Sequence, residues 1–297
     1  MPPDMADPAS SPDLLVSVVV PTYQHAGFIA TCLDSILGQE TTFPIEILVG
    51  EDESTDGTRE ICQRYAAEHP DRIRLFLRSR KDVMYIMGRP TGRANLLHLL
   101  REAKGKYIAM CEGDDHWTDP LKLQLQVDFM ETHPEHAACF HRAMLLRGTT
   151  EEPFKFPDSV DPLNVRYVDL IRYANFIPTA SLLFRNILGD LPAWMAKLPF
   201  ADMGLHLLLS RHGKIACLNE FMSVYRITGQ GAWSGLPTDA QDRSYLRFAK
   251  LIGPHLNREE RDAMREKTAT LLGRVANRRW PGHPRIQRLY RAYLRCS

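Results

Sequence analysis

The sequence predicts an α/β fold with a mostly parallel central sheet flanked by helices. Within about the first 115 residues, four short apolar runs alternate with three segments of helical periodicity. Such alternation is typical of βαβ units, in which each helix crosses over between two parallel strands. Polar or turn-forming residues follow the apolar runs, and α/β folds bind ligands at the carboxyl ends of their strands. The N-terminal half therefore has the pattern of a nucleotide-binding layer.

Four strands and three helices are predicted in this half. The strands cover residues 16–20, 45–50, 73–77 and 107–111, and the helices cover residues 28–37, 58–69 and 95–103. The first strand is rich in β-branched valine and stops at Pro21. The helix after it carries apolar residues at the spacing of one helix face. The last helix follows a loop with Gly88, Pro90 and Gly92 and ends near Gly105.

The second half is less regular in sequence. Asp119 is a good N-cap and Pro120 a favourable first helical residue, so we expect a helix from residue 119 to about 131. Further along, we expect strands at 137–146 and 214–218, a variable loop at 149–164, a helix at 203–211 and a helical pattern beyond 239. Repeats and low-complexity tracts are absent from the sequence.

The composition is that of an ordinary globular protein. Of 297 residues, 44% are hydrophobic and 25% are charged, which excludes a fibrous, collagen-like or wholly disordered chain. Lys and Arg number 37 against 36 Asp and Glu, a net charge of +1. Because the bulk charge is nearly zero, the molecule as a whole is not expected to bind polyanions such as nucleic acids.

Cysteine usage and the N-terminal segment indicate a cytoplasmic protein. The six cysteines are scattered without a C-x-x-C pair, which favours reduced thiols over a disulfide framework or a zinc ribbon. Residues 1–13 are rich in Pro and Asp, so we expect a disordered segment and not a signal peptide. The apolar run at residues 14–20 is far shorter than the ~20 residues that span a bilayer.

A cluster of acids, Glu112-Gly113-Asp114-Asp115, follows the fourth predicted strand. Three carboxylates so close together repel one another unless a cation lies among them. Mg²⁺ and Mn²⁺ take oxygen ligands and are typically held by one or two carboxylates together with substrate phosphates. The alternative is a solvated acidic turn that caps the next helix. A second acidic loop at the end of a neighbouring strand favours the cation site.

That second loop covers residues 51–57 and starts like a calcium-binding EF-hand loop. The match fails because the twelfth position is Gln63 instead of Glu, and because a strand precedes the loop. We therefore assign one of its carboxylates to a base or a ribose. Asp56-Gly57 is interpreted as a plain turn into the next helix.

Five segments together resemble the ordered motifs of family 2 glycosyltransferases with the GT-A fold. They are VVVPTYQ at 18–24, EDESTDGT at 51–58, GKYIAMCEGDD at 105–115, WTDPLKLQ at 117–124 and VYRITGQGAWS at 224–234. The resemblance covers roughly residues 15–234. It implies a Rossmann-like sheet and transfer of a sugar from a nucleotide-sugar donor, with Mn²⁺ or Mg²⁺ as cofactor and inversion at the anomeric carbon.

The resemblance implies donor-binding roles for residues in the first half. Pro21, Thr22 and Tyr23 would line the nucleoside pocket, and Asp52 would bind the base, most often uracil. Arg93 matches the basic residue that the family places near the donor.

The metal ligands also follow from the resemblance. Asp115 would be the principal metal ligand with Asp114 beside it, while Glu112 and Asp114 would lie near the sugar. Glu112 and Glu51 stand where the family usually has Asp, so each carboxylate reaches about one methylene further.

The catalytic base of the family is a carboxylate that begins a helix in the second half. Asp202 matches that place, and Asp190 and Asp239 are weaker candidates. The alternative for Asp202 is a plain helix N-cap. Thr228 stands where many relatives have a histidine, and Trp233 would either stack on a sugar ring or belong to the core.

The predicted function is that of a metal-dependent inverting glycosyltransferase with a UDP-linked donor. Its acceptor would be a hydroxyl of a glycan or lipid-linked glycan, in polysaccharide or glycoconjugate biosynthesis. A nucleotidyltransferase is one alternative, but the Gly-rich basic loop it would show after the first strand is absent from the sequence. A non-catalytic nucleotide-sugar-binding module is the other. Such a module would not need to retain the acidic residues of an active site, whereas this sequence contains Asp52, Asp114, Asp115 and Asp202.

Three regions are expected: a disordered segment at 1–13, a GT-A domain at 14–236 and a helical basic extension at 237–297. The GT-A domain would consist of a nucleotide-binding half at 14–118 and an acceptor-binding half at 119–236. Residues 273–297 contain seven arginines and no acid, interleaved with Trp280, Tyr290 and Tyr293. Such a helix can lie on an anionic membrane surface, here at the inner face, or pack on an acidic domain. Nucleic acid is not an expected partner, because no recognised binding motif accompanies the charge.

Overall fold

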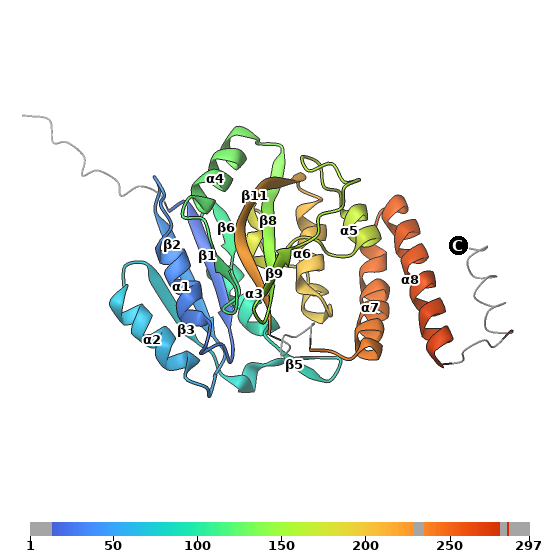
Figure 1. Ribbon diagram of the computed structural model, residues 1–297, viewed down its shortest axis with the longest axis horizontal. Helices are drawn as coiled ribbons and strands as arrows, with labels where there is room; N and C mark the ends of the chain where they lie inside the picture. Colours follow the sequence, from blue (N-terminus) through green and yellow to red (C-terminus); the bar gives the residue numbers. More distant parts are fainter. Residues whose placement is uncertain (1–13, 229–234, 280–283, 285–297) are drawn as a thin grey trace, which may run out of the picture.

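The computed structural model describes residues 14–228, 235–279 and 284, and shows a curled central sheet flanked by helices (Figure 1). The strands are β1 (Val16–Thr22), β2 (Ile45–Glu51), β3 (Ile73–Leu77), β4 (Met84–Ile86), β5 (Arg89–Thr91), β6 (Tyr107–Met110), β7 (His116–Trp117), β8 (His136–Arg147), β9 (Thr150–Pro153), β10 (Leu183–Arg185) and β11 (Lys214–Ile227). The helices are α1 (Ile29–Leu37), α2 (Thr58–Glu68), α3 (Arg93–Glu102), α4 (Lys122–Thr132), α5 (Tyr167–Tyr173), α6 (Ala201–Leu209), α7 (Thr238–Ile252) and α8 (Arg258–Arg279).

The N-terminal half confirms the predicted parallel layer. Strands β3, β2, β1 and β6 pair in that order, all in parallel, with α1, α2 and α3 in the crossovers. Alternate residues of each strand point to opposite faces of the sheet. Val18 and Ile47 therefore pack with α1 in one core cluster, whereas Val19 and Leu48 pack in a second cluster on the other face. The two-residue period of the apolar runs thus decides which helices cover which face.

The second half extends the same sheet through both antiparallel and parallel pairings. β10 pairs antiparallel with both β6 and β8, β11 lies parallel to β8, and β7 pairs antiparallel with β11. The C-terminal helices α7 and α8 pack beside α5 at one end of the molecule (Figure 1). Phe248 and Ile252 of α7 and Met264 of α8 are buried in the second core cluster. Helices α7 and α8 therefore share a core with the sheet. Residues 280–283 and 285–297 of the predicted extension lie outside the described residues.

Several element boundaries differ from the sequence prediction. The helix expected from Asp119 begins at Lys122, because the Asp119 carboxylate accepts a hydrogen bond from the Leu121 N–H and holds a turn before the helix. The helix expected at 203–211 covers Ala201–Leu209. The strand expected to end at 218 continues to Ile227, past irregularities in its pairing with β8 near Phe221. A β-bulge interrupts the apolar alternation without ending the strand.

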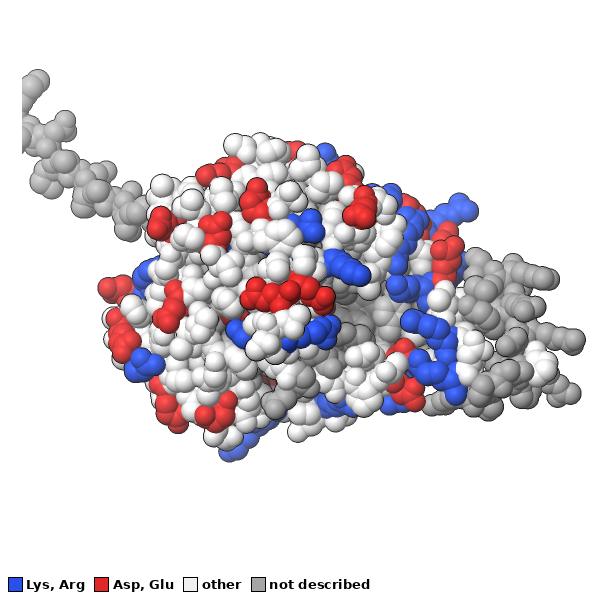
Figure 2. All heavy atoms as spheres, in the orientation of Figure 1, with Lys and Arg blue, Asp and Glu red and all other residues white. Residues whose placement is uncertain are grey.

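Two predicted loops contain strands that lack a periodic apolar pattern. β4 and β5 form a hairpin within the loop before α3. β9 pairs antiparallel with β8 at the start of the region expected to be a variable loop. Its Glu151 and Glu152 are exposed, and a strip of acidic atoms lies in Figure 2 where Figure 1 places β9. Charged residues on a short edge strand prevent pairing with other chains, so here polarity does not indicate a loop.

The remaining expectations concern thiols, membrane spans and the tail. Five cysteines of the described part of the chain are free and buried. None of the helices described here is long and apolar enough to cross a bilayer. Lys and Arg side chains gather over the C-terminal helices on the face shown in Figure 2. Arg278 pairs with Asp239 and Asp242 of α7, while the other basic residues of the predicted tail beyond α8 lie outside the described residues.

Buried histidines of the core predict a loss of stability in mild acid. His141 of β8 is fully buried, and its Nδ1 lies 2.8 Å from the carbonyl oxygen of Arg142. Burial, and secondarily the charge of Lys122, lower the pKa of His141 to about 3. The unfolded chain takes up a proton below about pH 6.5 and the folded chain does not, so this histidine opposes folding as the pH falls from 6.5 toward 3.

We expect His141→Gln to reduce this pH dependence. At pH 4.5 the unprotonated His141 costs roughly 2–3 kcal/mol of unfolding free energy in the wild type. Urea unfolding at pH 6.5 and pH 4.5 measures the difference for both proteins. The wild type should lose more free energy than the variant over this interval. Equal losses in the two proteins would contradict the assignment of this pH dependence to His141.

Candidate active site

Three polar loops meet at the carboxyl edge of the parallel strands, as the sequence predicts. Thr22 at the end of β1 pairs with Glu51 at the end of β2. On its other side, the Gly113 N–H donates to the Pro21 carbonyl, which ties the loop after β6 to the end of β1. A Cβ atom on Gly113 would lie only 2.4 Å from the Thr22 hydroxyl, so this close approach requires glycine.

The acidic loop after β6 holds a buried carboxylate with one oxygen unpartnered. Asp115 is 1% exposed, and its Oδ1 accepts a 2.8 Å hydrogen bond from the Arg226 N–H of β11. Its Oδ2 is buried and has no hydrogen-bond partner among the described residues. The Asp114 carboxylate lies 3.8 Å from Nε2 of His25 and is partly exposed. A buried unpartnered carboxylate oxygen is costly unless a ligand completes it.

Burial raises the proton affinity of two carboxylates of this loop, and mutual repulsion adds to the effect. Loss of hydration, followed by the charges of Asp114 and Asp202, raises the pKa of Glu112 to about 8. Burial, with Asp114 and Glu112, also raises the pKa of Asp115 well above its usual range. A divalent cation bound beside Glu112 and Asp115 would supply a counter-charge and favour their ionised forms.

The residues present therefore fit an oxygen-ligated cation of the Mg²⁺ or Mn²⁺ type. Within the described ranges, no group of three or more His, Cys, Asp or Glu side chains forms a ready-made metal site. A site with one or two protein carboxylates is the arrangement in which substrate phosphates complete the coordination. Asp115, with its unpartnered oxygen, and the neighbouring Asp114 are the side chains able to contribute.

Arg80 contacts both Tyr23 and Asp52 at the carboxyl edge of the sheet, where the family resemblance predicts the nucleoside pocket. The Arg80 guanidinium lies 4.1 Å from the centre of the Tyr23 ring and pairs with Asp52 Oδ2 at 2.9 Å. Asp52 is 4% exposed, and burial raises its pKa while Arg80 opposes the rise. Sequence reasoning missed Arg80. The signal available was the basic run RSRK directly after β3.

Glu51 has a structural role in the loop after β2. It is fully buried, accepts hydrogen bonds from the backbone N–H groups of Glu53 and Ser54, and pairs with Arg59 of α2. Its longer side chain thus organises the loop from which Asp52 projects. Pro21 and Thr22 lie within β1, where Thr22 is buried and its hydroxyl is 3.2 Å from Nδ1 of His25.

Asp202 approaches the acidic loop from the second half of the chain. It is the second residue of α6, whose N-cap is Phe200, so the alternative of a plain N-cap is wrong. Its Oδ1 accepts a 2.7 Å hydrogen bond from the Met203 N–H, and its Oδ2 accepts one of 2.7 Å from the Asn175 side chain. The charge of Asp202 contributes to the raised pKa of Glu112, so the two carboxylates are near enough to interact electrostatically.

Arg93 lies beside Asp202 at the start of α3. Its guanidinium is buried and donates to the carbonyl oxygens of Met195 and Leu198, in the segment that leads into α6. Burial lowers the pKa of Arg93 to about 10, and the charge of Asp202 opposes this shift. In this structure Arg93 therefore holds in place the segment that leads to Asp202. Trp233 lies outside the described residues.

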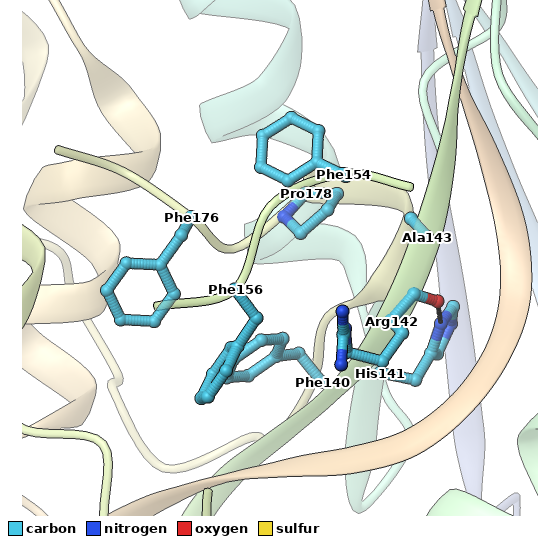
Figure 3. Close-up of a pocket in the computed structure, with 8 residues that line it drawn as sticks. All are labelled: Phe140, His141, Arg142, Ala143, Phe154, Phe156, Phe176 and Pro178. Atoms are coloured by element: carbon cyan, nitrogen blue, oxygen red, sulfur yellow. Dashed lines mark hydrogen bonds between the residues drawn. The ribbon is translucent and has the colours of Figure 1, made fainter. Parts of the chain in front are cut away.

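A cluster of aromatic rings backs the second half of the site (Figure 3). Phe140, Phe154, Phe156, Phe176 and Pro178 line a cavity of about 10 Å³ together with residues 141–143 of β8. That volume is at the limit for one water molecule and is too small for a sugar ring. The rings therefore pack the loop at 174–178, which carries Asn175, against the sheet.

The fold and the site define an α/β protein of the GT-A glycosyltransferase type. The chain matches the family model for glycosyl transferase family 2 over residues 17–190, and it belongs to that family. It is 36% identical over 229 residues to the uncharacterized protein Rv1520 of Mycobacterium tuberculosis, an alignment that covers 75% of this chain and 62% of that protein. It is also 38% identical over 120 residues to the putative glycosyltransferase EpsE of Bacillus subtilis, covering 40% of this chain and 39% of EpsE.

Solved structures with the same fold include two glycosyltransferases. Residues 1–349 of S. aureus TarS superpose with a TM-score of 0.60 at 16% identity, covering 92% of this chain and 77% of that one. The mannosyltransferase PcManGT of Pyrobaculum calidifontis gives a TM-score of 0.52 at 18% identity, covering 98% and 82%. These likenesses confirm the predicted GT-A fold. The chain spans about six tenths of the length of the Rv1520 relative.

Proposed function

We propose that this protein is a metal-dependent inverting glycosyltransferase that moves a sugar from a UDP-linked donor to an acceptor hydroxyl. One observation carries the proposal. The buried Asp115, with an unpartnered oxygen, lies in an acidic loop at the same sheet edge as Asp52, and the charge of Asp202, from the second half, affects Glu112 of that loop. In this arrangement the first half would bind the donor, and the second half would supply the group that accepts the proton.

Donor binding is assigned to the first half. Tyr23 would stack on the base, and Asp52 would accept a hydrogen bond from the base N–H, with Arg80 moving from between them. Support comes from TarS, solved in complex with UDP-GlcNAc and with UDP, and from PcManGT, solved with GDP-Man and Mn²⁺. Uracil is the base proposed here, because TarS has the higher TM-score of the two.

The diphosphate would be held at the acidic loop. Asp115 and Asp114 would bind Mn²⁺ or Mg²⁺, and when bound such an ion neutralises the negative charge that develops on the leaving diphosphate. Glu112 would lie near the donor sugar. Because Gly113 brings this loop against β1, the diphosphate and the base would be bound by neighbouring strand ends.

Asp202 is the proposed general base. It would take the proton of the acceptor hydroxyl as that oxygen forms a bond to the anomeric carbon and the bond to the diphosphate oxygen breaks. A direct displacement of this kind inverts the anomeric configuration. For this attack, Asp202 would lie on the side of the anomeric carbon away from the leaving group.

The acceptor is proposed to be a glycan or lipid-linked glycan in polysaccharide or glycoconjugate assembly. EpsE, named a putative glycosyltransferase, and TuaG, a putative teichuronic acid biosynthesis glycosyltransferase of Bacillus subtilis, support this class.

The domain boundaries at residues 14, 118 and 236 remain predictions from the sequence. Peripheral contact with the inner membrane face through the basic tail is likewise a proposal, as is a cytoplasmic location.

A thermal-shift screen tests the proposed donor class. We expect UDP-sugars to raise the Tm by about 5 °C or more at saturation when Mn²⁺ is present, because a ligand that binds only the folded state stabilises it. The shift should shrink without the metal, and Asp52→Ala should weaken it. GDP-sugars and ADP-sugars serve as controls for the base. Equal shifts with all three bases, or none with any nucleotide-sugar, would contradict a UDP-linked donor.

A further inference from the structure

The carboxylate of Asp202 is oriented by two hydrogen bonds. One comes from the Met203 backbone N–H within its own helix, and the other comes from Nδ2 of Asn175, 27 residues earlier in the chain. A carboxylate offers about four lone-pair sites, so two remain open, one on each oxygen. The two donors fix the rotation of the carboxylate and thereby fix where the open sites point.

The orientation of the Asn175 amide is itself determined. Its Oδ1 accepts a 3.1 Å hydrogen bond from the backbone N–H of Ile177, two residues later. Since a backbone N–H can only donate, the oxygen of the amide must face Ile177 and the nitrogen must face Asp202. Asn175 therefore presents a donor, and not an acceptor, to the carboxylate.

The segment that carries Asn175 is strained and firmly held. Ala174, directly before it, has φ of 66° and ψ of 174°, a conformation that is essentially restricted to glycine. On the other side Phe176 and Ile177 are buried, and Phe176 packs with Phe140 and Phe156 in the aromatic cluster (Figure 3). Strain of this kind persists only where the surroundings enforce it, and it concentrates at functional sites.

We propose that Asn175 is a positioning residue that holds the Asp202 carboxylate aimed at the acceptor hydroxyl. The inference rests on the proposed function, in which Asp202 takes the acceptor proton. A hydrogen bond donated to a carboxylate favours its charged form. The charge of Asp202 affects the pKa of the other titratable groups near it, which are Arg93 of α3, Glu112 after β6, Tyr167 of α5, Tyr225 of β11 and His206 of α6.

The diagnostic variant is Asn175→Asp. It keeps the size of the side chain and the acceptor for the Ile177 N–H, but it replaces the donor facing Asp202 with a carboxylate oxygen. We expect kcat to fall by about 10- to 100-fold and the acid limb of the kcat–pH profile to move to higher pH. The donor KM should be unchanged, because Asn175 lies in the second half and not beside Asp52 or Asp115.

Asn219→Asp is the matched control, because Asn219 is exposed on β11 and the substitution makes the same chemical change there. It should keep the wild-type kcat and pH profile. If Asn175→Asp fails to fold, Asn175→Ala provides the same measurement, with a fall in kcat at constant donor KM. A wild-type pH profile and kcat in Asn175→Asp, or a parallel change in KM and kcat, would overturn the inference.

The outcomes separate this inference from the proposed function. If Asp202→Asn lowers kcat while the Asn175 variants behave as wild type, Asn175 has no positioning role and the glycosyltransferase proposal stands. If the wild-type protein shows neither transfer nor metal-dependent hydrolysis with any nucleotide-sugar, both fail together.

Discussion

Asp202→Asn is expected to lower the turnover number by about 10²- to 10⁴-fold, the usual contribution of a general base. Asparagine has nearly the same shape, so the hydrogen bond from the Met203 N–H can persist while the ability to take a proton is lost. Donor affinity should be unchanged, because Asp52 and Asp115, the residues proposed to bind the donor, lie in the other half. Single-turnover transfer rates and donor titrations measure the two quantities separately.

Two matched variants control for this prediction. Asp190→Asn and Asp239→Asn make the same change at the two weaker candidates for the base, both of which are exposed. Asp239 pairs with Arg278 on the surface of the C-terminal helices, away from the acidic loop. Both variants should retain turnover. Normal turnover in Asp202→Asn, or a large loss in either control, would remove Asp202 from the proposed role.

The second large effect is expected for Asp115→Ala, which should abolish metal-dependent binding of the donor. Asp115 is buried and provides the unpartnered oxygen of the acidic loop. Removing an outer-shell partner of a metal ligand typically costs about 10- to 100-fold in metal affinity, and removing a ligand should cost more. Calorimetric titration of UDP-sugar with and without Mn²⁺ measures the loss.

Asp128→Ala is the control for this variant, because Asp128 is an exposed acid on α4. In Asp115→Ala the donor affinity in Mn²⁺ should fall to the metal-free value, whereas Asp128→Ala should keep the difference. The charge of Glu112 is one cause of the raised pKa of Asp115, so removing Asp115 removes a repulsive pair and the folded protein should remain stable. A variant that lacks Asp115 and still binds donor more tightly in Mn²⁺ would refute the assignment.

The parallel half of the fold could be predicted from the sequence because its signals are local. The apolar runs that become β1, β2, β3 and β6 are short, continuous and followed by turn residues. The carboxyl ends of parallel strands lie along one edge, so the loops containing Asp52 and Asp115 had to converge. The convergence of these loops thus follows from topology alone.

The second half could not be predicted in the same detail, because its elements depend on contacts with distant parts of the fold and not on local sequence patterns. β9 forms because β8 offers an edge, although Thr150–Pro153 is polar and exposed. α6 begins two residues earlier than its apolar pattern indicates, because Ala201 and Asp202 form a first turn that carries no apolar periodicity. The place of Asp202 opposite the acidic loop came from the resemblance to the family, and not from the pattern of its neighbours.

Two side chains of the site were not predicted at all. Arg80 contacts Tyr23 and Asp52 across 28 or more positions of sequence, and Asn175 reaches Asp202 across 27. Neither belongs to one of the five motifs, and an isolated Arg or Asn in a loop has many ordinary explanations. Their roles follow only from distances between atoms.

The most direct test of the central claim is the anomalous diffraction of Mn²⁺ in crystals grown with UDP. The acidic loop after β6 and the end of β1 should together hold one diphosphate. We expect a single strong anomalous peak beside the Asp115 carboxylate and in contact with diphosphate oxygens, with uracil between Tyr23 and Asp52. A manganese peak remote from Asp115, or UDP bound at another edge of the sheet, would contradict the account.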